Sequence, residues 1–117
     1  VRCVLETGAA AAGYETYTQF CTTCHEAKVV AADGTVEVIG APLGPDLTHF
    51  GSRTSLAAAL EENTAEHLAE WIDDPSSIKP MSPEMNDIEE GRIMGMPDYG
   101  LDEQQIQELV VLLESWK

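Results

Sequence analysis

Apolar residues recur at helical spacing in the first clear segment of the chain, from about Ala9 to Thr22. Gly13, Tyr17 and Cys21 are four residues apart and therefore share one face of this predicted helix. A glycine inside a helix costs roughly 1 kcal/mol relative to alanine. We therefore expect Gly13 to lie at a close contact with another helix.

The pattern changes over residues 28–39, where β-branched residues stand on both sides of Asp33-Gly34. An Asp-Gly pair between two such runs predicts a short β-hairpin. Residues 40–53 follow, and their repeated glycines and prolines predict an extended loop.

Two short helices are predicted next, from Ser55 to Glu62 and from Thr64 to Asp74. Pro75 ends the second one, and Asn63 or Thr64 is its N-cap. The residues expected to face inward are Leu56 and Leu60 in the first helix and Leu68, Trp71 and Ile72 in the second.

Residues 75–100 are rich in loop-forming residues, with a brief helical turn expected over 87–92. The last helix is the clearest, because Asp102 and Gln105 form a D-x-x-Q capping box at its start. Its apolar positions follow at i, i+3, i+4 and i+7: Ile106, Leu109, Val110 and Leu113.

A length of 117 residues predicts one domain. We expect a linker or tail over residues 1–8 and a single folded domain over residues 9–117. No run approaches the ~20 apolar residues needed to cross a bilayer, and no basic segment precedes an apolar one as in a signal peptide. The sequence therefore predicts a mature product or an excised domain with no membrane segment of its own.

The formal net charge is −15, and it lies mostly in the second half of the chain. Residues 61–117 contain 15 acidic and 3 basic residues. Such a charge disfavours nucleic acid and anionic lipid as partners. Two interpretations stay open, steering toward a basic partner or a generally acidic, well-hydrated surface.

The most specific motif is C-T-T-C-H, formed by Cys21, Cys24 and His25. It matches the C-x-x-C-H pattern of covalent haem attachment. In such a site the two thiols bond to the vinyl groups of the haem, and the adjacent imidazole binds the iron from one face. The motif therefore predicts electron-transfer chemistry.

A bare C-x-x-C pair is also typical of redox dithiols and zinc sites. A dithiol site would come with a thioredoxin-like βαβ pattern, which the sequence lacks. A zinc site would need a second close pair of ligands, whereas Cys3, His49 and His67 stand singly. The haem interpretation is therefore favoured. For Cys3, a free thiol in a poorly ordered tail is favoured over a lipid attachment or an intermolecular bond.

A haem that transfers electrons needs a strong ligand on each face of the iron. His25 would supply one, and a thioether on the other face raises the reduction potential. Met96, in G-M-P-D-Y-G-L just before the capped helix, is the candidate second ligand. The sequence also contains Met81, Met85 and Met94, of which Met94 is the main competitor.

Residues 10–117 as a whole resemble the class I cytochrome c family. Gly13 and Tyr17 match the glycine and the aromatic residue of the family's first helix, which pack against Leu109 and Leu112 of the last. The resemblance implies an all-α class I cytochrome c fold around one covalent haem c, here with a small β-hairpin insertion.

The resemblance also implies further haem-binding residues. In G-P-D-L, residues 44–47, the carbonyl of Pro45 would accept a hydrogen bond from His25 and so fix its tautomer. Arg53 falls where the family often has a cation near a buried haem propionate, and Trp71 where it has an aromatic residue over the haem. Their alternatives are an exposed loop arginine and a core tryptophan without a role at the haem.

A narrower resemblance is to the cytochrome c domain of subunit II of caa-type haem-copper oxidases. It lies in three runs, residues 44–58, 63–80 and 96–101. The link over residues 81–95 is longer than is usual in that family and contains four acidic residues. His49 matches the oxidase-type pattern, where it would lie near a propionate or at the surface, and His67 is expected on the exposed side of its helix.

These observations predict single-electron transfer and no bond-making chemistry by the domain itself. The expected donor is a small redox protein, the expected acceptor is the binuclear copper domain of a terminal oxidase, and the expected location is the periplasmic or outer face of the cytoplasmic membrane. Three rival classes are a free periplasmic carrier or dehydrogenase domain, a haem enzyme or gas sensor with an open sixth site, and a haem-free metal or dithiol module.

Overall fold

The computed structural model describes residues 8–30, 33–57, 59–79, 96 and 98–117. The expected tail residues 1–7 with Cys3, the helical turn at 87–92 and three of the methionines (Met81, Met85 and Met94) lie outside the described residues. No helix among the described residues is long and apolar enough to span a membrane.

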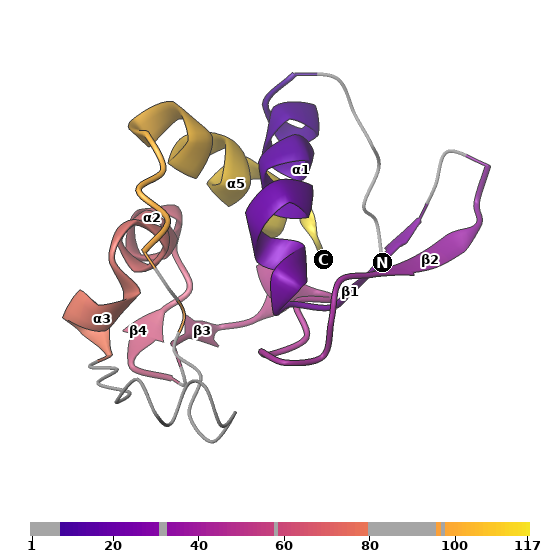
Figure 1. Ribbon diagram of the computed structural model, residues 1–117. Helices are drawn as coiled ribbons and strands as arrows, with labels where there is room; N and C mark the ends of the chain where they lie inside the picture. Colours follow the sequence, from indigo (N-terminus) through magenta and orange to yellow (C-terminus); the bar gives the residue numbers. More distant parts are fainter. Residues whose placement is uncertain (1–7, 31–32, 58, 80–95, 97) are drawn as a thin grey trace, which may run out of the picture.

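Two helices cross at the centre of the molecule, α1 (Ala9–Phe20) and α5 (Glu103–Ser115) (Figure 1). Four consecutive alanines start α1, and alanine is the best helix former. The helices touch at Gly13, which is buried, and a Cβ there would collide with the carbonyl of Glu108. The close contact predicted for Gly13 is therefore confirmed.

The capping box of α5 is also confirmed. The Asp102 carboxylate accepts a hydrogen bond from the Gln105 N–H at 2.8 Å, and the Gln105 side chain accepts one from the Asp102 N–H at 3.1 Å. These bonds satisfy donors that the first turn of a helix leaves without partners.

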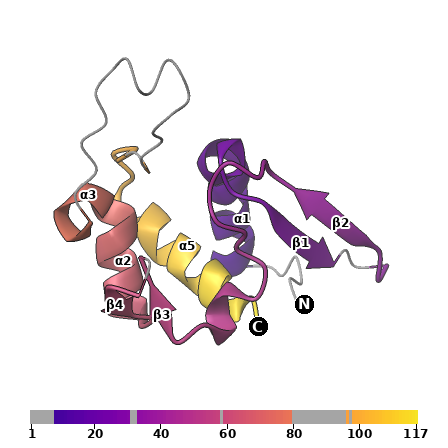
Figure 2. The same cartoon turned by 90° about the horizontal axis from the view of Figure 1, so that it is seen from below.

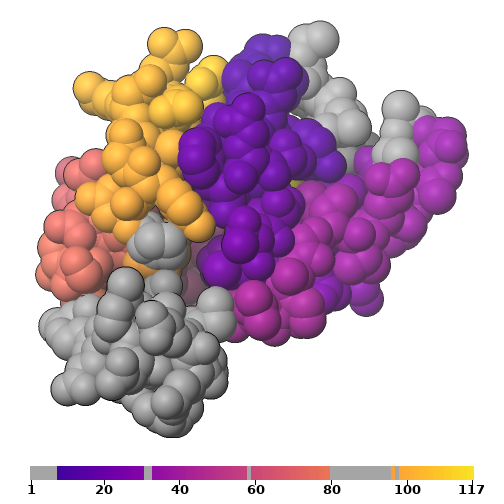
Figure 3. Space-filling model, in the orientation of Figure 1, coloured from indigo at the N-terminus to yellow at the C-terminus, as the bar shows by residue number. Residues whose placement is uncertain are grey.

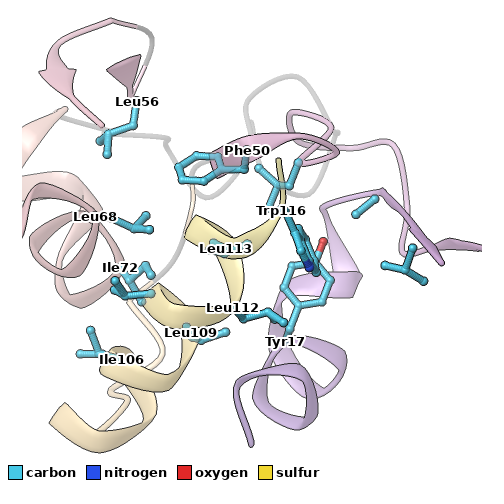
Figure 4. Close-up of a cluster of buried hydrophobic side chains, with 14 residues drawn as sticks. Tyr17, Phe50, Leu56, Leu68, Ile72, Ile106, Leu109, Leu112, Leu113 and Trp116 are labelled. Carbon is cyan, nitrogen blue, oxygen red and sulfur yellow. The ribbon is translucent and has the colours of Figure 1, made fainter. Parts of the chain in front are cut away.

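The core lies between α1, α5 and α2 (Ala65–Asp73), as Figure 4 shows. Tyr17 of α1 meets Trp116 edge to face, with ring centroids 5.0 Å apart. Leu68 and Ile72 of α2 face Ile106 and Leu109 of α5. Since every one of these side chains is buried, they account for the packing of the three helices.

Helix α2 confirms the second of the two short helices, with Thr64 as its N-cap: the Thr64 hydroxyl accepts from the His67 N–H at 3.1 Å. A further short helix, α3 (Pro75–Ile78), was not predicted. Pro75 is its first residue, a position that suits the fixed φ and missing N–H of proline.

The predicted hairpin is confirmed as strands β1 (Ala27–Val30) and β2 (Val36–Ile39), which pair antiparallel with Val30 opposite Val36. It projects from one side of the molecule, away from α2 and α3 (Figure 2). The space-filling view shows the same separation, with the hairpin beside α1 and on the opposite side from α2 (Figure 3).

The predicted helix from Ser55 to Glu62 is wrong. Strands β3 (Ser55–Leu56) and β4 (Glu61–Glu62) form a second, very short hairpin there. Ala57 and Ala59 have φ values of 53° and 69°, which turn the chain back at a conformation that a helix does not allow. Leu56 is buried as expected, but Leu60 is 57% exposed. The predicted loop over residues 40–53 is present and contains a single 3₁₀ turn, η2 (Phe50–Ser52).

Candidate functional site

A cavity of about 520 Å³ opens between the end of α1, the loop before η2, the β3–β4 hairpin, α2 and α5. Its walls are mainly apolar, and the buried side chains among them include Leu47, Leu56, Leu68, Leu109 and Leu113. This volume lies in the range of cavities that enclose small organic ligands and cofactors.

The structure brings together all seven residues that the sequence suggested for a cofactor. The residues that line this one cavity include Cys21, Cys24, His25, Pro45, Arg53, Trp71 and Met96. They come from segments up to 75 residues apart, and the fold alone makes them neighbours.

The C-T-T-C-H run lies directly after α1, where the helix tightens into a 3₁₀ turn, η1 (Cys21–Thr23). The carbonyl of Cys21 accepts hydrogen bonds from the N–H groups of Cys24, at 3.2 Å, and His25, at 2.8 Å. The Tyr17 hydroxyl donates to the carbonyl of His25 at 3.3 Å. The two thiols and the imidazole therefore stand on a turn that the end of α1 holds in place.

The loop before η2 packs against this turn and orients the imidazole. Leu43 donates its N–H to the Cys24 carbonyl at 3.1 Å, and His25 Nδ1 lies 2.8 Å from the Pro45 carbonyl oxygen. With Nδ1 as the donor, Nε2 is left as the lone-pair nitrogen. The hydrogen bond that the resemblance implied is thus present.

Gly44 allows this close approach of loop and ring. A Cβ at Gly44 would lie 2.9 Å from His25 Cε1 and 3.1 Å from Nδ1, well inside an ordinary van der Waals contact. The loop backbone therefore packs directly against Cε1 and Nδ1 of the imidazole, and any side chain at this position would push the ring.

The Cys21 thiol differs from that of an exposed cysteine in its surroundings. Burial, and then the charge of neighbouring Cys24, raises the pKa of Cys21 to about 11. Burial, and to a smaller extent the charge of Cys24 and Cys21, also raises the pKa of Tyr99. Tyr99 therefore lies close to the thiols, and its ring packs on Phe20 with centroids 5.1 Å apart.

Three further predicted residues lie on separate walls of the cavity. Met96 and Trp71 are half-buried, and Trp71 comes from α2. Arg53 follows η2; its guanidinium lies 5.7 Å from the Phe50 ring centroid and donates a hydrogen bond to the Asp46 carbonyl. Their roles toward a cofactor remain predictions.

The other two histidines are not part of the cavity wall. His49 Nδ1 lies 2.7 Å from the carbonyl oxygen of Lys117, which ties the residue before η2 to the segment after α5. His67 is half-exposed on α2, where its Nδ1 donates to the Glu62 carbonyl at 3.0 Å. Within the described part of the chain, no group of three or more His, Cys, Asp and Glu side chains could hold a metal ion.

Sequence reasoning missed several residues of this wall. Phe20, Lys79 and Tyr99 all line the cavity. Phe20 directly precedes Cys21, and Tyr99 is three residues beyond Met96, so nearness to the motifs was a usable signal for both. Lys79 lies in the run 63–80 that resembles the oxidase domains, but the sequence assigned it no role. The course of α2 and α3 brings it to the cavity.

The residues present fit a covalently attached haem. Two thiols and an oriented imidazole stand together at one wall, a thioether and a tryptophan reach the same space, and most of the remaining wall is apolar. A flat apolar macrocycle with acidic side chains needs such walls together with a few cations.

Comparisons with known proteins show the family of this chain. The model of the cytochrome c family matches residues 10–117. Cytochrome c oxidase subunit 2 from Alkalihalophilus pseudofirmus is 35% identical over 98 residues, and the match covers 83% of this chain. The chain spans only 22% of the length of that relative.

Among solved structures, cytochrome c2 from Rhodobacter capsulatus matches with a TM-score of 0.57. The match covers 92% of this chain and 97% of that one at 24% sequence identity. At this identity the likeness concerns the fold, and it is the class I cytochrome c fold.

Proposed function

Because the chain belongs to the cytochrome c family, whose members carry haem c and transfer electrons, we propose that Cys21 and Cys24 hold one haem c and that His25 and Met96 bind its iron. When bound, the haem supplies a one-electron couple between two oxidation states of the iron. The observation that carries the assignment is that these four residues line one apolar cavity.

The imidazole is prepared for this role by its surroundings. The hydrogen bond from His25 Nδ1–H to the Pro45 carbonyl orients the ring and leaves Nε2 as the nitrogen that can bind the iron. Gly44 packs closely against the Cε1 and Nδ1 atoms of the same ring. Together they limit the movement of the ligand, which favours electron transfer because little has to rearrange when the oxidation state changes.

Methionine substitutions test the second ligand. Met96→Ala should abolish the weak sulfur-to-iron absorption band of the oxidised protein and lower its reduction potential, because a thioether favours the reduced iron. Matched variants at Met81, Met85 and Met94 should keep the band. Loss of the band in Met94→Ala together with its survival in Met96→Ala would show that the ligand was assigned to the wrong residue.

The attachment itself has a separate test. Purified from a host that matures haem c, the protein should keep its haem through acid-acetone extraction, because two thioether bonds anchor it. Extractable haem would show that Cys21 and Cys24 are not both linked. A low-spin spectrum that carbon monoxide leaves unchanged would exclude a haem enzyme or gas sensor with an open sixth site.

For the partners, we infer that the chain is the electron-entry domain of a terminal oxidase. The relative named cytochrome c oxidase subunit 2 supports this inference, and the remainder of that protein leaves room for other domains. The donor would be a small redox protein, the acceptor a binuclear copper domain, and the location the outer or periplasmic face of the cytoplasmic membrane.

The gene sequence upstream of Val1 tests the oxidase inference. We expect it to encode membrane-spanning segments followed by a β-rich domain with Cys, His and Met ligands for two copper ions. Tethering would then keep donor haem and acceptor copper at a high effective concentration. A signal peptide directly before Val1, with no other domain, would instead identify a free periplasmic carrier.

A further inference from the structure

Two cations stand at the cavity of a strongly acidic protein. The chain has 21 acidic residues and only 6 lysines and arginines, yet Arg53 and Lys79 both line this cavity. No Asp or Glu is among the described residues of the cavity wall. The charge of the wall is therefore opposite in sign to the charge of the whole chain.

Neither cation forms a close ion pair with a carboxylate of the described residues. The Asp46 carboxylate, whose pKa is lowered chiefly by hydrogen bonds from Thr48, also interacts at longer range with the charge of Arg53. The ion pair found in that part of the chain joins His67 and Glu61, 3.5 Å apart. Arg53 donates to a backbone carbonyl, that of Asp46. Lys79 directly follows α3 as its C-cap, and its backbone N–H donates to the Pro75 carbonyl at 3.0 Å. The residue is exposed and is among those that line the cavity.

A cation without a close carboxylate partner beside an apolar cavity is suited to an anionic ligand. A carboxylate that enters such a cavity loses hydration, and this is costly unless an opposite charge or a hydrogen bond replaces the water. The haem of the proposed function has two propionate carboxylates. The sequence resemblance assigned a cation to this task at Arg53, and it left His49 either near a propionate or at the surface. Because His49 does not line the cavity, Lys79 is the other cation of the described cavity wall that could meet the second carboxylate.

We propose that Lys79 is the second propionate-binding residue, so that Arg53 and Lys79 each hold one carboxylate of the haem. This inference rests on the proposed function. Lys79 acts as a positioning residue: its ammonium fixes one edge of the macrocycle and adds positive charge near the iron. Because the oxidised iron carries one more positive charge than the reduced iron, a nearby cation favours reduction.

Charge substitution at Lys79 tests the inference, with Lys28 as the matched control. Lys28 lies exposed on β1 and does not line the cavity. At a fixed applied potential, Lys79→Gln should lower the reduced-to-oxidised ratio about three- to tenfold, where tenfold corresponds to ~59 mV for a one-electron couple. Lys28→Gln makes the same change in net charge and should alter the ratio less than twofold, and Lys79→Arg should stay within twofold of the wild type.

A second measurement needs no variant. In the reduced, diamagnetic wild-type protein, nuclear Overhauser contacts should join the side-chain methylenes of Lys79 to the methylene protons of one haem propionate. Absence of these contacts would overturn the proposal, as would equal effects of Lys79→Gln and Lys28→Gln on the potential. A purified protein without covalently bound haem would instead overturn the proposed function itself, so the two failures are distinguishable.

Discussion

Gly44→Ala is the sharpest test of how the loop before η2 holds the imidazole of His25. The added Cβ would lie 2.9 Å from His25 Cε1, and the ring cannot turn away without lengthening its 2.8 Å hydrogen bond to Pro45. The φ of Gly44 lies outside the left-handed region, so alanine meets no backbone penalty there. The variant therefore isolates the steric contact.

The magnitude follows from three contributions. Crowding at a packed site costs about 1–3 kcal/mol, and loss of the hydrogen bond adds about 1 kcal/mol. Alanine also lowers the conformational entropy of the unfolded chain relative to glycine, which offsets about 0.4–1 kcal/mol of this loss. We expect Gly44→Ala to lose roughly 1–3.5 kcal/mol of unfolding free energy, which lowers Tm by roughly 4–14 °C.

Thermal unfolding of the haem-loaded protein, followed by circular dichroism, measures this loss. Pro45→Ala is the matched control, because it keeps the carbonyl that accepts from His25 and should cost less than about 1 kcal/mol. A Gly44→Ala protein as stable as the wild type, with an unchanged haem spectrum, would refute the argument that the loop presses on the imidazole.

Three further outcomes are expected. Gly13→Ala should destabilise the protein by about 1–2 kcal/mol in denaturant unfolding, because the added Cβ collides with the Glu108 carbonyl. This cost exceeds the gain from the better helix propensity of alanine, and a more stable variant would contradict the argument. Asp102→Ala removes the cap of α5 and should cost about 1 kcal/mol in the same assay, whereas no change would show that the box is dispensable. NMR titration of His67 should give a pKa above 6.5, chiefly because its ring donates a hydrogen bond to the Glu62 carbonyl. The protonated ring therefore stabilises the fold below pH 6.5, and this contribution is lost as the pH rises through the raised pKa. A measured pKa below 6.5 would contradict this.

Local sequence signals were sufficient wherever a few neighbouring residues determine the structure. The capping box at Asp102 and Gln105 places its donors and acceptors within one helical turn, and Asp33-Gly34 closes a hairpin through its own backbone preference. C-T-T-C-H carries its chemistry in five consecutive residues. Gly13 was identified as a contact point because a glycine in a helix interior is otherwise unfavourable.

The segment from Ser55 to Glu62 shows where local signals failed. Its alanines and the spacing of Leu56 and Leu60 favour a helix, but helix propensity amounts to less than 1 kcal/mol per residue for such residues. Tertiary structure instead places Leu56 in the core and lines the cavity with Ala57 and Ala59, both at positive φ. Burial of a leucine, worth about 1.5–3 kcal/mol, is large enough to override that preference.

The composition of the cavity was likewise decided by the tertiary structure. The sequence alone determined the haem attachment motif, the first and last helices and the family resemblance that named Pro45, Arg53, Trp71 and Met96. Only the folded chain brought Lys79 to the same wall as Arg53 and set Gly44 against the ring of His25. The physical reason is that contacts between residues far apart in the chain depend on how α2, α3 and the loop before η2 pack around α5, and no local pattern in the sequence records that packing.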